Sequence, residues 1–311
     1  MTNERPSNQA FRIRRAVIWR IALVILGASL SGVPCNSGTE PAWSGPPMIS
    51  EDGSTVIRLT GPVHAPGEVV DIGFFNPDGK QRAIVARRHG LINWAFSPDG
   101  YMLIWGTIIG RNGRFLSLYA SNGRLRWEKL APFTGRMDVA ATGHRTAVEV
   151  GQSEGGVQRG KYVLLLNDAG SEVQRYSIGA EEWVRYLSFC GSDRFLVMTT
   201  TSEVLMFDAE TLNVRWKTTE RTEVVYTPGV IMSHDLSQMA LLDGIQVKEK
   251  EETHLRFRVT LFDAKTGRIV KQKTLPEDFG KLRGKGFRYD RKRKSFVVET
   301  KERSYELSSG Q

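Results

Sequence analysis

The chain has 311 residues, of which 40% are hydrophobic and 25% are charged, a composition typical of a soluble globular protein and not of a disordered or membrane-embedded one. Its two cysteines, Cys35 and Cys190, are too few for a disulfide framework or a cysteine-rich zinc site. The formal net charge is +9, of which residues 1–35 carry +4 through five arginines against Glu4. The mild excess on the rest of the chain therefore says little about partners.

The first 35 residues have the layout of a secretory signal. Basic residues at 12–15 precede an apolar run from Ile21 to Val33, and a short stretch of small residues ends the segment. We expect residues 1–35 to be a signal peptide or, as a hydrophobic helix, a membrane anchor, although the apolar run is shorter than the roughly 20 residues that a spanning helix needs. Both alternatives place the rest of the chain outside the cytoplasm, because basic residues stay on the cytoplasmic side.

Cys35 adds a third alternative. It resembles the lipidated cysteine of lipoprotein signals, in which the cysteine follows a small residue, but Val33 and Pro34 depart from that pattern. Cleaved signal, uncleaved anchor and lipoprotein thus stay open. Residues 36–47 hold three prolines, two glycines and two serines, so we expect a flexible tether there, ahead of a folded domain over residues 48–311.

Two alternating series of hairpins fill this domain. In the first series the turns lie near Gly123, Gly170, Leu212 and Gly267, about 41 to 55 residues apart, which is the length of a four-stranded propeller blade. The second series lies between these turns and is clearest at 91–105, where a Pro-Asp-Gly turn separates two apolar segments. Short apolar segments without a helical period predict an all-β fold with two hairpins per repeat.

These hairpins resemble the repeats of the WD40 and quinoprotein-like (PQQ-like repeat) β-propeller superfamilies. The segment Phe96–Gly100 looks like the inner hairpin turn of such a blade, and Phe207–Ala209 and Phe262–Gly267 look like the outer strand pair of quinoprotein repeats. The resemblance covers about 260 residues as a structural pattern, although no repeat ends in the Trp-Asp pair. It implies a β-propeller. Because many such repeats bind no quinone, we expect no cofactor.

We expect about six four-stranded blades, with five or seven as alternatives. Complete units lie at 91–130, 136–178, 183–220 and 224–276. An earlier unit at 47–90 is less regular, because Phe75–Gly79 fits either of its hairpins. The last stretch, 284–309, has room for three strands only. We expect a strand near Trp43 or at Thr55–Thr60 to complete it, since closure removes an exposed sheet edge.

No catalytic or metal-binding constellation stands out. Gly151–Gly155 matches the Gly-x-Ser-x-Gly nucleophile motif, but no helix follows it as that motif requires, so we interpret it as a hairpin loop. No two of the five histidines have the spacing of metal ligands. We predict no catalytic, cofactor-binding or metal-binding residues. We expect the large flat tryptophans to pack between blades, namely Trp94, Trp105, Trp127, Trp183 and Trp216.

One segment is strongly basic. Residues 281–294 contain eight basic residues against a single acid, Asp290, with Phe287 and Tyr289 among them. This pattern suits either a patch for an anionic partner or a solvated hairpin turn, and nucleic acid is an unlikely partner for an exported protein. The candidate anionic-partner patch consists of Lys281, Arg283, Lys285, Arg288, Arg291, Lys292, Arg293 and Lys294.

These features predict a non-catalytic, extracytoplasmic β-propeller that acts as an interaction or scaffold platform at the cell envelope. We expect its partner to be another protein, with membrane contact through the N-terminal segment. Two alternatives stay open. One is a hydrolase or lyase with its site at the central channel, which would need inward-facing carboxylates or histidines. The other is a binder of anionic envelope polymers through residues 281–294, and fold alone does not decide among these functions.

Overall fold

The structure is a computed structural model of the chain and describes residues 44–50, 52–60, 69–108, 110–131, 134–154, 157–179, 182–219, 224–249, 252–278 and 282–308. The expected export segment at 1–35, with its hydrophobic helix and Cys35, lies outside these residues, and so does Trp43. Within the described part of the chain, no helix has the length and apolar character needed to cross a membrane.

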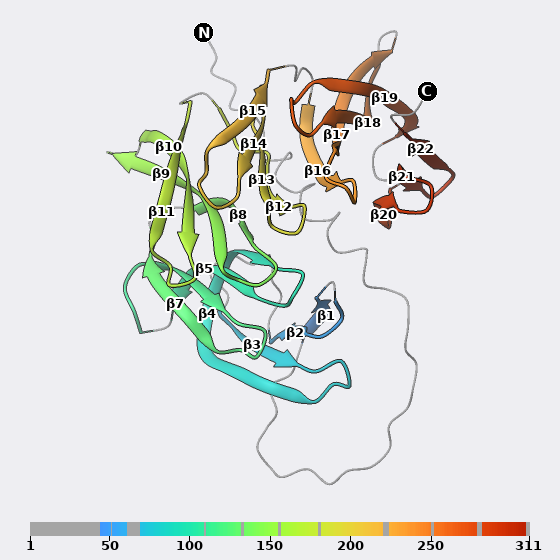
Figure 1. Cartoon of the computed structure of the whole chain (residues 1–311). Helices are drawn as coiled ribbons and strands as arrows, with labels where there is room; N and C mark the ends of the chain where they lie inside the picture. Colours follow the sequence, from blue (N-terminus) through green and yellow to red (C-terminus); the bar gives the residue numbers. More distant parts are fainter. Residues whose placement is uncertain are drawn as a thin grey trace.

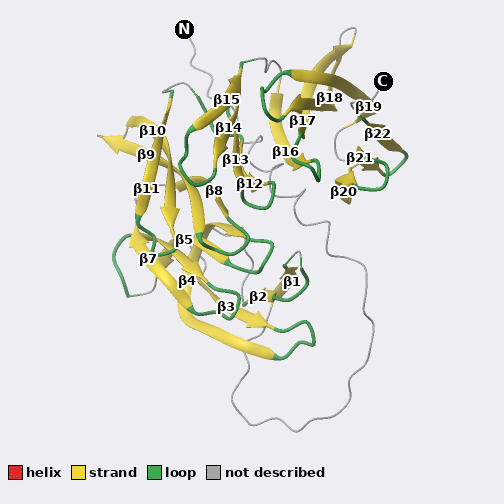
Figure 2. Ribbon diagram, viewed as in Figure 1, coloured by secondary structure: helices red, strands yellow, loops and turns green. Residues whose placement is uncertain are grey.

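The strands form six antiparallel sheets that follow one another in chain order, where the seven-stranded ladder β1–β7 is counted as two sheets that share β4 (Figure 2). The first sheet contains β1 (Ser44–Ile49), β2 (Val56–Leu59), β3 (Val69–Phe75) and the first part of β4 (Gln81–Phe96). The second contains the rest of β4, β5 (Met102–Ile108), β6 (Arg114–Tyr119) and β7 (Leu125–Leu130). The third contains β8 (Thr134–Val139), β9 (Arg145–Glu154), β10 (Val157–Asn167) and β11 (Glu172–Ile178).

The fourth sheet contains β12 (Tyr186–Cys190), β13 (Phe195–Thr199), β14 (Val204–Asp208) and β15 (Val214–Thr218). The fifth contains β16 (Val224–Met232), β17 (Gln238–Glu249), β18 (Glu252–Asp263) and β19 (Ile269–Asp278). The sixth contains β20 (Leu282–Asp290), β21 (Ser295–Thr300) and β22 (Ser304–Leu307). β4 serves two sheets, because its first part pairs with β3 and its second part with β5.

The sheets are arranged around an axis like the blades of a propeller. The innermost strands of the second to sixth sheets, β4, β8, β12, β16 and β20, contact one another in that order. Figure 1 shows the chain passing from the first sheet (blue) to the sixth (red) in an arc. The all-β class and the six repeated sheets are thus confirmed, and the final sheet has the three strands that its length allowed.

The middle strands of the sheets inside the ring are apolar on both faces because each of these sheets packs between two neighbours. All five residues of β13 and the first four of β14 are buried. The outermost strand β15 instead buries only Trp216 and exposes most of its other side chains. A strand that is covered on both faces has a continuous run of apolar residues in its sequence, whereas apolar and polar residues alternate in a strand with one exposed face.

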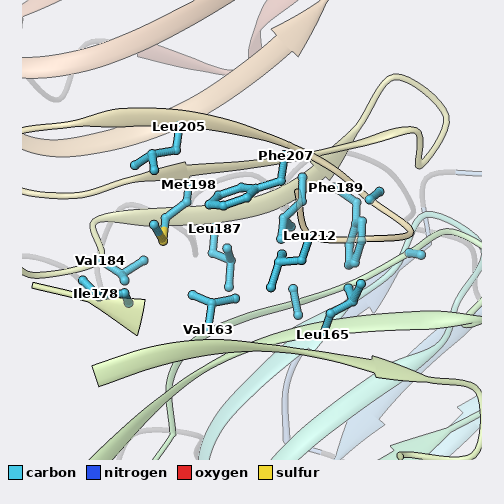
Figure 3. Packing of buried hydrophobic residues seen from close by; sticks show 14 residues of the cluster. Val163, Leu165, Ile178, Val184, Leu187, Phe189, Met198, Leu205, Phe207 and Leu212 are labelled. Carbon is cyan, nitrogen blue, oxygen red and sulfur yellow. The ribbon is translucent and has the colours of Figure 1, made fainter. Parts of the chain in front are cut away.

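Five clusters of buried apolar side chains join consecutive sheets. Figure 3 shows the cluster between the third and fourth sheets, where Val163 and Leu165 of β10 lie opposite Leu187, Leu205 and Phe207. Four similar clusters join the first sheet to the second, the second to the third, the fourth to the fifth and the fifth to the sixth. None of these five clusters joins the sixth sheet to the first.

The Phe-Asp-Ala motifs close the outer hairpins and tie them to the inner ones. In the fifth sheet, the Asp263 carboxylate accepts hydrogen bonds from the amide and the hydroxyl of Thr266, at 2.8 and 2.7 Å. The amide of the next residue, Ala264, donates to the carbonyl of Ser237 in the inner hairpin turn. The fourth sheet repeats this arrangement at Asp208. The motif therefore has a structural role in both sheets.

The closing strand differs from the prediction. Thr55–Thr60 contains β2, which pairs with β1 and β3 inside the first sheet, so it does not complete the sixth sheet. The prediction is wrong here because β1 already takes the innermost place in the first sheet and β2 follows it in a hairpin. β1 also begins at Ser44, inside the expected tether. Phe75–Gly79 spans the end of β3 and the turn into β4, so it belongs to the outer hairpin.

The tryptophans divide into buried and exposed ones. Trp105, Trp127 and Trp216 are buried between sheets, as expected. Trp183 is 54% exposed, with the Lys161 ammonium 3.3 Å from its ring centroid. The expectation of a core position is wrong for this residue, because it lies in the loop between two sheets and not on a strand.

Candidate functional site

A cavity of about 740 Å³ opens between the first two and the last two sheets. It lies where the β4–β5, β16–β17 and β20–β21 turns converge. Its volume falls within the usual range of ligand pockets, roughly 300–1,000 Å³. The cavity therefore occupies the region between the last sheet and the first, which none of the five apolar clusters fills.

One wall comes from the first two sheets. Ile49 ends β1 and is 58% exposed, which is unusual for so large an apolar side chain. Phe96, Ser97 and Pro98 lead from β4 into its turn and line the same wall. The backbone amide of Asp52 donates to the Pro98 carbonyl at 3.4 Å, so the turn after β1 and the turn after β4 are held together.

The opposite wall comes from the fifth and sixth sheets. Ile231 and Met232 lie at the end of β16, and Phe287 and Tyr289 lie on β20. Three of them, Ile231, Phe287 and Tyr289, also pack against the apolar cluster between the fifth and sixth sheets. Exposed His234 stands at the rim. Most of the cavity wall is thus apolar, and both sides are fixed by neighbouring packing.

Two arginines reach the cavity, and they differ in their pairing. Arg288 donates to Glu299 at 2.7 Å and lies 3.7 Å from Asp290. The hydrogen bond to Glu299 raises the pKa of Arg288. Arg291 is exposed in the turn after β20 and makes no ion pair with any residue that the structure describes. Of these two arginines, Arg291 is therefore the one whose positive charge is available to a ligand.

Two carboxylates near the rim accept hydrogen bonds from residues of the turns in which they lie. The Ser233 and Ser237 hydroxyls donate to Asp235 at 2.7 and 2.8 Å, and the hydrogen bond from Ser233 is the main cause that lowers the pKa of Asp235 to about 2. Asp290 accepts the backbone amides of the two residues at 292 and 293, which lowers its pKa. Both are ionised at neutral pH, and both already have donors.

The structure divides the predicted basic patch. Arg288 and Arg293 are engaged by carboxylates, the latter by Glu306 at 3.2 Å. Three residues of the turn, Arg291, Lys292 and Lys294, are exposed and have no ion pair within the described ranges. Lys281 lies outside the described residues, and Arg283 and Lys285 lie on β20 with side chains that are not described. Of the patch residues whose side chains the structure describes, Arg288 and Arg291 line the cavity.

Two carboxylates of the inner hairpins, Asp138 and Asp193, link the third sheet to the fourth. Asp138 on β8 accepts the amide of Phe189 at 2.7 Å, and Asp193 of the fourth sheet accepts the amide of Ala141 in the third at 2.7 Å. Burial raises the pKa of Asp138 to about 6. Among the described residues, no group of three or more histidine, cysteine, aspartate or glutamate side chains could hold a metal ion.

Neither Ser153 nor Cys190 lies in a setting that activates a nucleophile. Ser153 lies on β9, opposite Gln158 of β10, so the Gly-x-Ser-x-Gly segment is part of a hairpin, as predicted, and not a strand-to-helix turn. Burial raises the pKa of the Cys190 thiol to about 12, which keeps it protonated, whereas a nucleophilic cysteine needs thiolate character.

Sequence reasoning missed most of the cavity wall. Ile49, Ile231 and Met232 end apolar strands and look like ordinary core residues in the sequence. The Phe96–Gly100 turn was recognised as a turn only. The wall segments between Ile49 and Tyr289 lie up to about 240 residues apart, and nothing local to Ile49, Ile231 or Met232 signals that they converge. The one available signal was the basic cluster after Tyr289, which marks one side of the cavity.

No protein-family model matches the sequence, and no curated protein matches it significantly. Solved structures resemble it in fold. One described as the eukaryotic initiation factor aligns at 12% identity over 86% of this chain and 60% of its own length, with a TM-score of 0.52. The β-propeller domain of Myceliophteria thermophila Cps50 (Swd1) aligns at 10% identity over 84% of this chain and 96% of its own, with a TM-score of 0.42.

A chain of the mitotic checkpoint complex aligns at 10% identity over 84% of this chain and 75% of its own, with a TM-score of 0.49. At such low identity these likenesses concern the fold alone. The likeness to the initiation factor, with a TM-score of 0.52, accords with the repeated radial sheets and gives no support to the PQQ-like subtype in particular.

Proposed function

We propose that this chain is a non-catalytic, extracytoplasmic interaction platform that receives a protein partner at the cavity between its first and last sheets. The observation that supports this most is the composition of the cavity, in which fixed apolar walls meet an exposed arginine, Arg291. Aromatic and arginine side chains are enriched at the centres of protein interfaces, and exposed apolar surface rimmed by polar groups is typical of binding sites.

Affinity capture from envelope fractions tests this proposal. The tagged full-length chain should retain a specific protein that an unrelated tagged propeller does not retain. The same chain with the cavity obstructed by Ile49→Arg should retain less of that protein. If no protein is enriched over the control in any growth condition, the platform proposal is wrong.

The proposed location rests on residues 1–35, whose charged start and apolar run favour export. The mass of the mature chain distinguishes the three alternatives. If the signal is cleaved, the 34.9 kDa chain loses the residues before a cleavage site near residue 35. A lipoprotein instead begins at a lipid-modified Cys35. An uncleaved anchor keeps the full mass and is found in the membrane fraction. A full-mass chain in the cytosolic fraction would contradict the proposal.

The hydrolase or lyase alternative has less support. The described innermost strands carry two carboxylates, Asp138 and Asp290, and each accepts backbone amides of its own fold. Acid–base hydrolysis of a glycosidic bond uses two carboxylates that flank one substrate. The walls of the cavity are formed instead by apolar, histidine and arginine side chains.

A further inference from the structure

The region between the sixth and first sheets exposes apolar surface that a ligand can contact. Elsewhere in the ring, each sheet covers the apolar face of its neighbour. At the cavity, Ile49 is 58% exposed, and Phe96 and Phe287 are only partly buried on opposite walls. An apolar side chain of a ligand can occupy here the position that side chains of an adjacent sheet occupy in the other five interfaces.

The charge at the rim favours an anion. Arg291 lines the cavity, and Lys292 and Lys294 follow it in the same exposed turn. Asp235, in the β16–β17 turn of the same wall, accepts hydrogen bonds from the hydroxyls of its own turn. A ligand carboxylate placed at Arg291 would form a charge-assisted hydrogen bond, and such bonds are about twice as strong as neutral ones.

The chain's own N-terminal segment does not match this charge. Residues 1–43 carry five arginines against Glu4 and Glu40, so they are cationic and would be repelled by the turn at 291–294. A highly charged polymer such as a polyphosphate or an acidic polysaccharide matches the arginine but leaves the apolar walls unused. The complementary ligand combines carboxylates with apolar side chains.

We infer that the cavity binds an extended acidic peptide segment of another protein, with an apolar side chain between the opposed walls and a carboxylate at Arg291. This inference rests on the proposed function and names the partner chemistry of the same site. Ile49 and Phe287 form the apolar part of the site, and Arg291 supplies its specificity for acidic segments.

A defined peptide tests the inference. The probe is a short fluorescein-labelled peptide in which a Leu-Phe pair is flanked by glutamates, titrated with the full-length chain and followed by fluorescence anisotropy. Two matched peptides replace the Leu-Phe pair by Ser-Ser or the glutamates by lysines. We expect the first peptide to bind about tenfold more tightly than either control, because each control removes one half of the complementarity.

Three variants locate the site. Arg291→Glu should weaken binding by about tenfold or more, and Ile49→Ser by severalfold, since each removes one of the proposed contacts. Arg124→Glu makes the same charge change at an exposed turn residue of the second sheet, away from the cavity lining, and should leave binding unchanged. Circular dichroism of each variant should match that of the wild-type chain, which separates lost binding from lost folding.

Other outcomes overturn the inference. Equal binding of the Ser-Ser peptide, competition by dextran sulfate and loss of binding at about 1 M salt would identify a surface for anionic polymers. A photo-crosslinker at position 49 that captures residues 1–43 of the same chain would identify an internal occupant. If Arg291→Glu retains the captured envelope protein as well as the wild type does, the platform stands and this site for it is wrong.

Discussion

The interface between the fourth and fifth sheets and the region between the sixth and first sheets differ in how they are filled. In the former, the Trp216 ring stacks on Phe262 at 5.7 Å and its indole nitrogen donates to the Ala264 carbonyl at 2.8 Å. In the latter, Arg288 pairs with Glu299 beside an open cavity. Consecutive sheets can bury their apolar faces against each other as the chain continues, whereas the last and first sheets meet only at the end. The proposed binding surface lies at that meeting point.

The packed interfaces should respond most strongly to truncation. Phe207 is fully buried between the third and fourth sheets. Phe207→Ala should lower the free energy of unfolding by about 3–5 kcal/mol, because it removes apolar burial and leaves a cavity. Urea unfolding followed by tryptophan fluorescence measures this loss. A loss below about 1 kcal/mol would mean that this interface is not a main source of stability.

The turn glycines should be the next most sensitive positions. Gly267 has a φ of +72°, and a Cβ there would lie 2.6 Å from the Trp216 ring. Gly267→Ala should cost about 2–4 kcal/mol, from left-handed backbone strain together with overpacking. Gly53→Ala is the matched control, because Gly53 has a φ of +70° and open space around it.

The control should cost only the backbone part, about 1–2 kcal/mol. Urea midpoints of the two variants give the comparison directly. If both variants lose the same stability, the contact between the turn of the fifth sheet and Trp216 contributes nothing, and the interface between the fourth and fifth sheets depends on fewer contacts than we describe.

The stability that Asp138 contributes between the third and fourth sheets should depend on pH. Burial raises the folded-state pKa of Asp138 from 3.8 to about 6, so its stabilising contribution is present below about pH 4 and is lost as the pH rises through 6. Asp138→Asn keeps an oxygen acceptor for the Phe189 amide but does not ionise. The variant should therefore gain roughly 1–3 kcal/mol over the wild type between pH 4 and pH 7. Urea unfolding at both pH values measures this difference in the free energy of unfolding. If the free energy of unfolding of the wild type and of Asp138→Asn changed equally with pH, the raised pKa of Asp138 would be contradicted.

The smallest effect is expected at the open region. Ile49→Ser should change the free energy of unfolding by no more than about 0.5 kcal/mol, because Ile49 is 58% exposed. The same variant should weaken binding of the acidic peptide. A large loss of stability would show that Ile49 packs into the ring, and the contrast between the packed interfaces and the open region would then fail at this position.

The repeat pattern made most of the fold predictable. Turns such as Phe96–Gly100 and Phe262–Gly267 mark hairpins through local chemistry, namely glycine in a left-handed conformation and aspartate accepting backbone amides. Counting those hairpins yields the six sheets and the three-stranded end, because each sheet is contiguous in sequence. The exceptions come from the first sheet, where prolines suggested a tether at 36–47 although Ser44–Ile49 forms a strand.

The candidate site was much less predictable. The basic patch was visible as a run of residues, yet the pairing of Arg288 and Arg293 with Glu299 and Glu306 depends on cross-strand neighbours. Those neighbours follow from register, and register is set by the turns of a hairpin and not by charge. The convergence of Ile49 with Phe287 depends on the whole ring, so no local pattern could have predicted it.

β4 runs without interruption from the outer edge of the first sheet to the inner edge of the second. The ladder of backbone hydrogen bonds is therefore continuous from β1 to β7, whereas the described strands of the later sheets form separate ladders. Breaking the hydrogen bonds of either of the first two sheets must therefore disturb β4, which both sheets share. They should accordingly exchange their amide hydrogens as one cooperative unit, slower to open than a sheet held by packing alone, and this joint unit would keep one wall of the cavity in place.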